Sequence, residues 1–148
     1  WGIDPVMFAE ELAAIDADLA SWAPAGTPDV SSEAVDAYVA RIRATLDNPV
    51  FFVAHHYTRY LGDLSGGQAI GALLGRAFGI TDGTGLSMYS FDAIEKPKPY
   101  KDGYRARLNE LAVSDAEKDA IVDEVRIAFG LNSALFIELG RNLAQYQR

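Results

Sequence analysis

The sequence contains no cysteine, which excludes disulfide bonds, thiol catalysis and cysteine-based zinc or iron–sulfur sites. No apolar run approaches the roughly 18 residues of a membrane-spanning helix, and we expect no signal peptide. The sequence also lacks a P-loop, an HExxH motif and a dinucleotide fingerprint. Because 148 residues fit a single domain, we expect one cytoplasmic domain, residues 1–148, without a membrane partner.

Positive charge is scarce, since 13 basic residues face 21 acidic ones and the net charge is −8. An acidic chain of this kind repels nucleic acid and anionic membranes, so neither is an expected partner. The exception is a basic cluster that consists of Lys96, Lys98, Lys101, Arg105 and Arg107. This cluster indicates an anionic ligand or an acidic partner, unless it is simply the solvated face of a charged helix.

Capping residues and apolar spacing predict helices and no paired strands, so the expected fold class is all-α. Asp4-Pro5 begins the first helix, which extends for about 18 residues. Its apolar face consists of Phe8, Leu12, Ile15, Leu19 and Trp22. A second helix follows the caps offered by Ser31 and Ser32 and ends at Asn48-Pro49. Its apolar stripe consists of Val35, Val39, Ile42 and Leu46.

The third helix is predicted over residues 50–78, with Gly79 as its stop. Residues 80–99 are predicted to form an irregular connection, in which only residues 86–91 are candidates for extended backbone. A short basic helix is expected at residues 100–111.

Ser114 and Glu117 form a capping box that opens the last helix, which is predicted to run to about Tyr146. Its helical stripe consists of Ile121, Val125, Ala128, Asn132, Phe136, Leu139 and Leu143. Asn132 is the one amide on that face, and a buried amide must find hydrogen-bond partners. It either bridges two helices or lines a polar pocket, and the sequence leaves both open.

Three glycines, Gly62, Gly66 and Gly67, lie within the third predicted helix, although each costs about 1 kcal/mol relative to alanine. Thr58, Gly62 and Gly66 are spaced four residues apart and therefore share one face. Bare backbone on that face allows either tight helix packing or the close approach of a flat ligand. The glycines alone do not separate these two interpretations.

Charged and titratable residues follow the same helical spacing. Arg59 and Asp63 form either a surface ion pair or part of a site in which Asp63 holds water and relays protons. On the basic helix, Lys101 and Arg105 are suited to clamp a carboxylate. The two histidines, His55-His56, point about 100° apart, so each is separately a metal ligand or, more commonly, a structural group.

A long motif resembles the signature of haem oxygenases, namely the run YTRYLGDLSGGQ at residues 57–68. Residues 128–136 resemble the last core helix of that family, and residues 100–105 resemble its propionate-facing helix. Residues 11–22 resemble the helix that precedes Tyr38. The resemblance covers essentially the whole chain and implies the multi-helical haem oxygenase fold, while the Ala and Gly content is typical of a bacterial member.

The resemblance implies that the helix with Gly62 and Gly66 is the distal helix, whose backbone closely approaches dioxygen held over the haem. Asp63 would order the water that delivers a proton to this oxygen. Arg59 and Tyr38 would belong to the same hydrogen-bonded network. Contacts to the haem would come from Tyr57, Gly62, Ser65, Gly66, Lys101, Arg105, Phe129, Asn132 and Phe136.

The resemblance also places the iron ligand outside the sequence. In this family a neutral histidine on a helix near the N-terminus holds the iron, and no residue of this chain corresponds to it. His55 and His56 correspond to the distal side, so we expect no metal ligand among the 148 residues. The chain resembles roughly the C-terminal two-thirds of a haem oxygenase, and we expect an N-terminal portion to precede Trp1 in the intact protein.

The implied function is oxidative cleavage of haem to biliverdin, carbon monoxide and ferrous iron. Haem would be substrate and cofactor together, and electrons would come from a reductase or ferredoxin. The 148 residues alone are expected to bind haem weakly and to turn over little. Two other interpretations stay open: a non-catalytic haem-binding or haem-transfer protein of the same fold, and a helical interaction domain that keeps only the fold.

Overall fold

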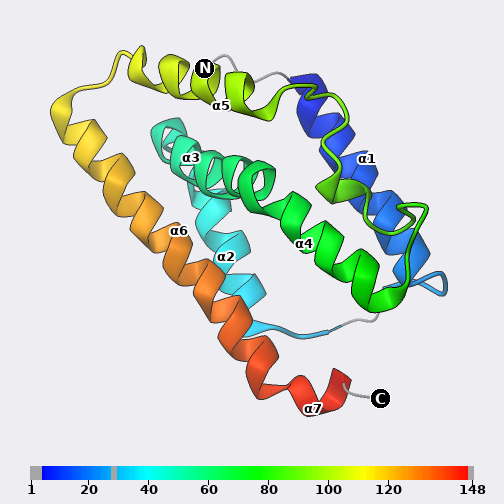
Figure 1. Cartoon of the computed structure of the whole chain (residues 1–148). Helices are drawn as coiled ribbons and strands as arrows, with labels where there is room; N and C mark the ends of the chain where they lie inside the picture. The colour runs from blue at the N-terminus through cyan, green and yellow to red at the C-terminus, as the bar shows by residue number, and fades with distance from the viewer. Residues whose placement is uncertain (1–4, 28–29, 147–148) are drawn as a thin grey trace. The chain divides into compact units, whose positions relative to one another are not determined.

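A computed structural model describes residues 5–27 and 30–146 of the chain (Figure 1). The described residues are helical and contain no strand, which confirms the all-α fold class. None of the helices in these ranges is long and apolar enough to cross a membrane. The backbone divides into two compact units, Trp1–Asp29 with Leu61–Ala112 and Val30–Tyr60 with Val113–Arg148. That the whole chain makes a single domain stays a prediction.

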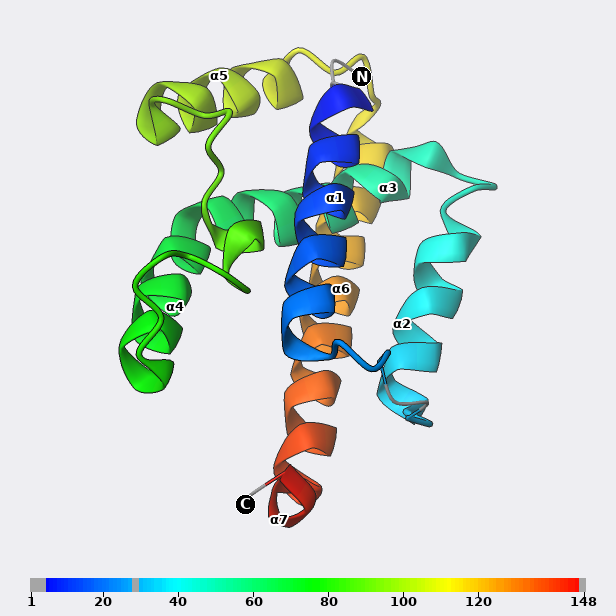
Figure 2. The same cartoon turned by 90° about the vertical axis from the view of Figure 1, so that its right-hand side faces the viewer.

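The first unit contains α1 (Pro5–Trp22), α4 (Gly62–Phe78), the short 3-10 helix η2 (Ser87–Tyr89) and α5 (Pro97–Asn109). The segment after α4 folds back along that helix before it reaches α5 (Figure 2). α5 begins three residues earlier than predicted, because Pro97 takes the first helical position, where proline is well tolerated.

The helix α1 binds the segment around η2 through hydrogen bonds made by Asp18 and by Trp22, the last member of its predicted apolar face. Asp18 is buried and accepts hydrogen bonds from the backbone N–H groups of Ser87 at 2.8 Å and Met88 at 2.9 Å. Trp22 donates from Nε1 to the Gly85 carbonyl at 2.7 Å. The prediction of extended backbone at residues 86–91 is therefore wrong, since Asp18 caps a 3-10 turn there. Four members of the predicted apolar face are exposed, namely Leu12, Ile15, Leu19 and Trp22. Asp4 and the side chain of Phe8 lie outside the described residues.

The second unit contains α2 (Glu33–Ala44), α3 (Pro49–His56), α6 (Asp115–Arg141) and α7 (Leu143–Tyr146). α2 and α3 both pack against α6. The predicted caps are confirmed: Ser32 Oγ accepts from the Val35 N–H at 3.1 Å, and Ser114 with Glu117 forms the capping box of α6. The last helix reaches Tyr146 as predicted, apart from a break at Asn142.

The helix α2 runs antiparallel to α6, since its first turn is bound near the C-terminal end of α6 and its last turn is bound further toward the N-terminus of α6. The Ala34 N–H, in its first turn, donates to Glu138 at 3.0 Å, and Arg41, in its last turn, binds Glu124. Ala34 and Tyr38 are buried. The apolar stripe that the sequence shows lies one residue further along and is exposed, namely Val35, Val39, Ile42 and Leu46.

Helical backbone continues without a break from Pro49 to Phe78, as predicted for residues 50–78. Gly79 ends it in a left-handed conformation with φ of 67°, which glycine adopts at little cost. The sequence did not predict the π-helical turn η1 (Tyr57–Leu61), which lies between α3 and α4. Single π-helical turns inside α-helices are rare and occur frequently at functional sites.

Candidate functional site

The glycines of α4 lie on two different faces of the helix. A Cβ atom on Gly67 would lie 3.1 Å from Cδ1 of Tyr89, and one on Gly71 would lie 2.9 Å from Cβ of the same residue. These two glycines therefore form a packing seam for η2. A Cβ atom on Gly62 or Gly66 would meet nothing within 4 Å. Gly62 and Gly66 thus leave the backbone of α4 open, so helix packing does not explain them.

Polar side chains of the first unit adjoin the two open glycines in the sequence, and a lysine of α5 lies near one of them. Asp63 follows Gly62 in the first turn of α4 and is half-buried. Ser65 precedes Gly66, and its hydroxyl lies 3.4 Å from the Lys101 ammonium of α5. The structure therefore brings together Ser65 and Lys101, two of the residues predicted to contact haem.

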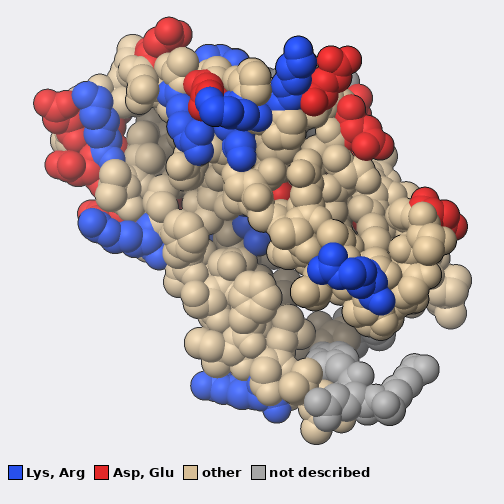
Figure 3. Space-filling view, viewed as in Figure 1, with Lys and Arg blue, Asp and Glu red and all other residues tan. Residues whose placement is uncertain are grey.

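The basic side chains of α5 gather at the top of the molecular surface in Figure 3, over the place that α5 occupies in Figure 1. Lys98 pairs with Asp102 at 2.7 Å, and Arg105 lies 3.7 Å from the other oxygen of that carboxylate. The hydrogen bond from Lys98 lowers the pKa of Asp102 below its usual value. Lys101 is half-buried and adds a further positive charge, which suits this helix to an anionic ligand.

In the second unit, Arg59 of η1 donates from Nη1 to Oδ1 of Asn132 on α6 at 2.9 Å. This bond fits the helix-bridging interpretation of Asn132. It also joins Arg59, which the resemblance assigns to the hydrogen-bonded network of Asp63, to Asn132, which the resemblance assigns to the haem contacts. Tyr38 of the same unit is buried on α2, with its ring 5.9 Å from the ring of His55.

The remaining predicted haem contacts of this unit lie on two helices. Phe129 and Phe136 are seven residues apart on α6, so they share one face, and both are exposed. Tyr57 is half-buried in η1. Exposed aromatic rings on one helix face are typical of a surface that receives another group.

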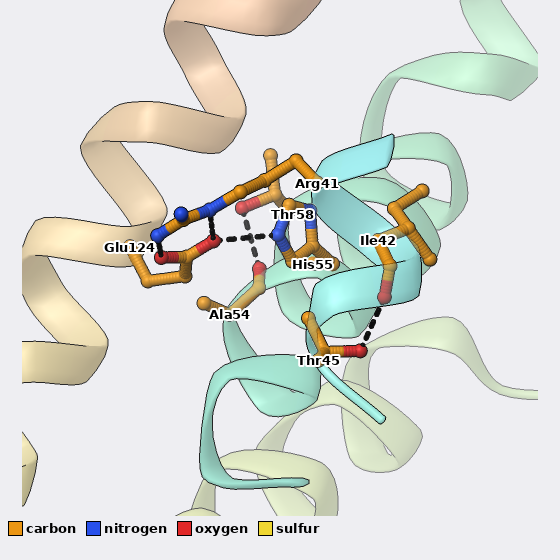
Figure 4. Close-up of polar contacts among 7 residues, drawn as sticks. All are labelled: Arg41, Ile42, Thr45, Ala54, His55, Thr58 and Glu124. Atoms are coloured by element: carbon orange, nitrogen blue, oxygen red, sulfur yellow. Dashed lines mark hydrogen bonds and ion pairs between the residues drawn. The ribbon is translucent and has the colours of Figure 1, made fainter. Parts of the chain in front are cut away.

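A buried ionic cluster of the second unit was not predicted (Figure 4). Glu124 of α6 is 2% exposed and accepts two hydrogen bonds from Arg41, one of them from Nε at 2.8 Å. Its Oε1 also lies 2.8 Å from Nε2 of His55. The Arg41 hydrogen bond lowers the pKa of Glu124, and the same bond raises the pKa of Arg41. A carboxylate acceptor requires the proton of His55 on Nε2.

These contacts give both histidines a structural role. His55 is held by Glu124, and buried His56 stacks on Tyr60 with ring centroids 5.0 Å apart. Burial lowers the pKa of His56, which favours its neutral form. No cluster of three metal-ligating side chains occurs within the described ranges. The available signal for Glu124 was its position four residues before Ala128, on the buried side of the last helix.

Comparison with known proteins identifies the family. The family model for heme oxygenase matches residues 3–138. The chain belongs to the haem oxygenase family. Among curated haem oxygenases, heme oxygenase 1 of Nostoc is 47% identical over 113 residues, which is 76% of this chain and 48% of that protein. Human heme oxygenase 1 is 39% identical over 142 residues, 91% of this chain and 49% of that protein.

Solved haem oxygenase structures share the fold. The structure from Leptospira interrogans matches with a TM-score of 0.81 and 37% identity, over 90% of this chain and 68% of that chain. The crystal structure of heme oxygenase-1 from the cyanobacterium Synechocystis in complex with heme matches with a TM-score of 0.79 and 39% identity, over 88% of this chain and 60% of that chain. The chain spans about half the length of the curated haem oxygenases it matches.

Proposed function

We propose that this chain carries the distal and propionate-binding parts of an enzyme that cleaves haem to biliverdin, carbon monoxide and ferrous iron. Haem serves there as the substrate and, by binding and activating dioxygen at its iron, also as the cofactor. The observation that carries the proposal is the open backbone at Gly62 and Gly66 within a chain of the haem oxygenase family. A flat ring needs such a face, because any side chain on it would hold the ring away from the helix.

The basic side chains of α5 in the first unit suit the negatively charged propionate groups of haem. Its propionates are carboxylates, for which the ammonium of Lys101 and the guanidinium of Arg105 are natural partners. Asp63 is the acid closest in sequence to both open glycines, which supports a role for it in holding a water molecule beside that face. Its proposed role is to keep that water in position as a proton donor.

The residues of the second unit are proposed to support the proton-delivery network and to contact the haem. Arg59 donates a hydrogen bond to Asn132. We propose that Arg59 and Tyr38 belong to the hydrogen-bonded network through which Asp63 delivers protons. Tyr57, Phe129 and Phe136 are proposed contacts of the haem. We further propose that electrons come from a reductase or ferredoxin and that the protein is cytoplasmic.

The test is Asp63→Ala in the complete protein, with Asp82→Ala as a matched control in an exposed loop of the same unit. Asp63→Ala should suppress biliverdin formation while hemin still binds, because it removes the water-holding carboxylate and leaves the glycine face intact. Asp82→Ala should behave as the wild type. Normal biliverdin yield from Asp63→Ala would overturn the role of Asp63.

Hemin titration of the 148-residue chain tests the proposal independently. We expect weak binding and little turnover from this chain alone, and efficient biliverdin production from it would contradict that expectation. If the complete wild-type protein binds hemin but forms no biliverdin, the haem-binding or haem-transfer interpretation replaces the enzyme. If micromolar hemin gives no Soret shift, only the fold is shared.

A further inference from the structure

We propose that the Thr58 hydroxyl is a positioning group for Arg59. Figure 4 shows this hydroxyl on the Ala54 carbonyl. By holding that carbonyl, the hydroxyl maintains the π-helical turn from which Arg59 reaches Asn132. The inference rests on the proposed function in one respect, since Arg59 is assigned there to the proton-delivery network. Spacing puts Thr58 on the side of Gly62 and Gly66, but its hydroxyl is bound to the Ala54 carbonyl, and Thr58 is not among the residues proposed to contact the haem.

The first observation is the bond itself. Thr58 Oγ1 donates to the Ala54 carbonyl oxygen at 2.7 Å, from inside the turn to the preceding helix α3. Threonine hydroxyls that bond back to the carbonyl four residues earlier bend helices. Ala54 is fully buried, so its carbonyl has no access to water, and the backbone N–H of Tyr57 is a second donor to it. A donor is therefore fixed to this carbonyl at the junction where α-helical backbone gives way to the π-helical turn.

The second observation is the pair of contacts on either side of Thr58. His55 is bound to Glu124, and Arg59 is bound to Asn132, so one helix, α6, holds both sides of the junction. The contacts are four residues apart on one segment and eight residues apart on α6. At 1.5 Å per residue, eight residues of α-helix rise about 12 Å and four rise about 6 Å. The long Arg59 side chain spans the difference, so the direction in which it leaves the turn decides whether it meets Asn132.

The decisive variants are Thr58→Val, which keeps the branched shape and removes the hydroxyl, and Thr58→Ser, which keeps the hydroxyl. A matched control is Thr45→Val. Thr45 likewise donates from Oγ1 to a carbonyl, that of Ile42 at 2.6 Å, but it is buried where Thr58 is half-buried, and it lies at the end of α2. It therefore reports the loss of the same kind of bond away from Arg59.

The first readout is amide hydrogen exchange of residues 57–61 in the complete protein without hemin. Thr58→Val should exchange faster by roughly 2- to 10-fold, the range that corresponds to losing one ordinary hydrogen bond. Thr58→Ser should restore the wild-type rates, and Thr45→Val should leave these amides unchanged. Unchanged exchange in Thr58→Val, or equally fast exchange in Thr58→Ser, would overturn the proposal. This readout does not depend on haem chemistry, so it stands even if the proposed function fails.

The second readout separates positioning from general destabilisation. Biliverdin formation by Thr58→Val should fall by roughly 2- to 10-fold with hemin affinity unchanged. In the Arg59→Gln background, Thr58→Val should cause no further loss, because the residue through which it acts is gone. Additive losses in the double variant, or a normal rate in Thr58→Val, would show that the hydroxyl does not act through Arg59.

Discussion

Nε2 of His55 lies 2.8 Å from Oε1 of Glu124, and both side chains are almost completely buried in the second unit. Arg41 donates to both oxygens of the same carboxylate. One buried negative charge therefore joins α2, α3 and α6. Removing Glu124 leaves buried His55 and half-buried Arg41 without their carboxylate partner, which is more costly than losing a fully exposed ion pair.

We accordingly expect Glu124→Gln to lower the free energy of unfolding by about 3 kcal/mol at pH 7. Glutamine keeps the shape of the side chain but removes the negative charge that pairs with Arg41 and one of the two acceptor oxygens. Urea unfolding of wild type and variant measures the difference. The control is Asp123→Asn, whose carboxylate pairs with Arg126 on the surface and should contribute less than about 1 kcal/mol. If the two variants lower the free energy of unfolding equally, the buried charge of Glu124 is not what stabilises the contact of α2, α3 and α6.

The same cluster predicts a dependence on pH. The folded-state pKa of Glu124 is lowered, so its contribution is complete above the unfolded-state pKa of about 4.3 and is lost as the pH falls through the folded-state pKa. Wild type and Glu124→Gln should therefore converge in stability as the pH is taken from 7 toward 3. A gap between the two curves that stays constant across this range would show that the charge of Glu124 is not what stabilises the unit.

Opposite effects are expected from adding one methyl group at two glycines of α4. Gly66→Ala meets open space and should raise the free energy of unfolding by about 0.5–1 kcal/mol, because alanine is the better helix former. Gly71→Ala places its Cβ 2.9 Å from Tyr89 Cβ and should lower it. Chemical unfolding measures both. If Gly66 faces haem, Gly66→Ala should also weaken hemin binding despite its greater stability, a combination that a mere packing position does not produce.

Two small side chains are fully buried on the helices α3 and α6, which contact each other in the second unit. Ala54 of α3 and Ala128 of α6 are both fully buried. Ala128→Leu should therefore lower the free energy of unfolding by about 1–3 kcal/mol or more through overpacking. Ala40→Leu is the matched control, because Ala40 is exposed on α2 and should change stability by less than about 0.5 kcal/mol. A neutral Ala128→Leu would show that α3 and α6 are not tightly packed at this point.

Local signals in the sequence predict the helices well, and the structure shows why. The cap at Ser32, the capping box at Ser114 and the stop at Gly79 each act within a few residues of backbone. The π-helical turn Tyr57–Leu61 has no such signal, because the same residues also satisfy α-helical spacing. The 3-10 turn η2 depends on Asp18, which lies about 70 residues earlier in the chain.

The candidate site was only partly predictable for the same reason. Spacing alone placed Gly62 and Gly66 on one face, but only the position of Tyr89 separates this open face from the packed one. The contacts of Glu124 were not predictable from local spacing, because its partner Arg41 is 83 residues away. At α2 the apolar spacing predicts the wrong buried face. The buried face includes Tyr38 and half-buried Arg41, whereas the more apolar neighbouring residues are exposed.

Lys101 and Arg105 provide the last prediction, which concerns the anionic ligand of α5. Each variant, Lys101→Gln and Arg105→Gln, should weaken hemin binding by roughly 2- to 10-fold, because a partly exposed ion pair contributes about 1 kcal/mol. Arg107→Gln is the control, since Arg107 lies on the same helix but has no assigned haem contact. Hemin titrations in the complete protein at low and high salt measure these affinities.

Salt distinguishes a charge effect from a change of shape. Screening by about 0.5 M salt should reduce the wild-type affinity toward that of the variants, while the variants themselves change little. A loss that is the same for Arg107→Gln would instead mean that overall positive charge attracts the ligand. A loss confined to Lys101→Gln and Arg105→Gln requires specific contacts, as expected if Lys101, beside Ser65, meets a propionate next to the open glycine face.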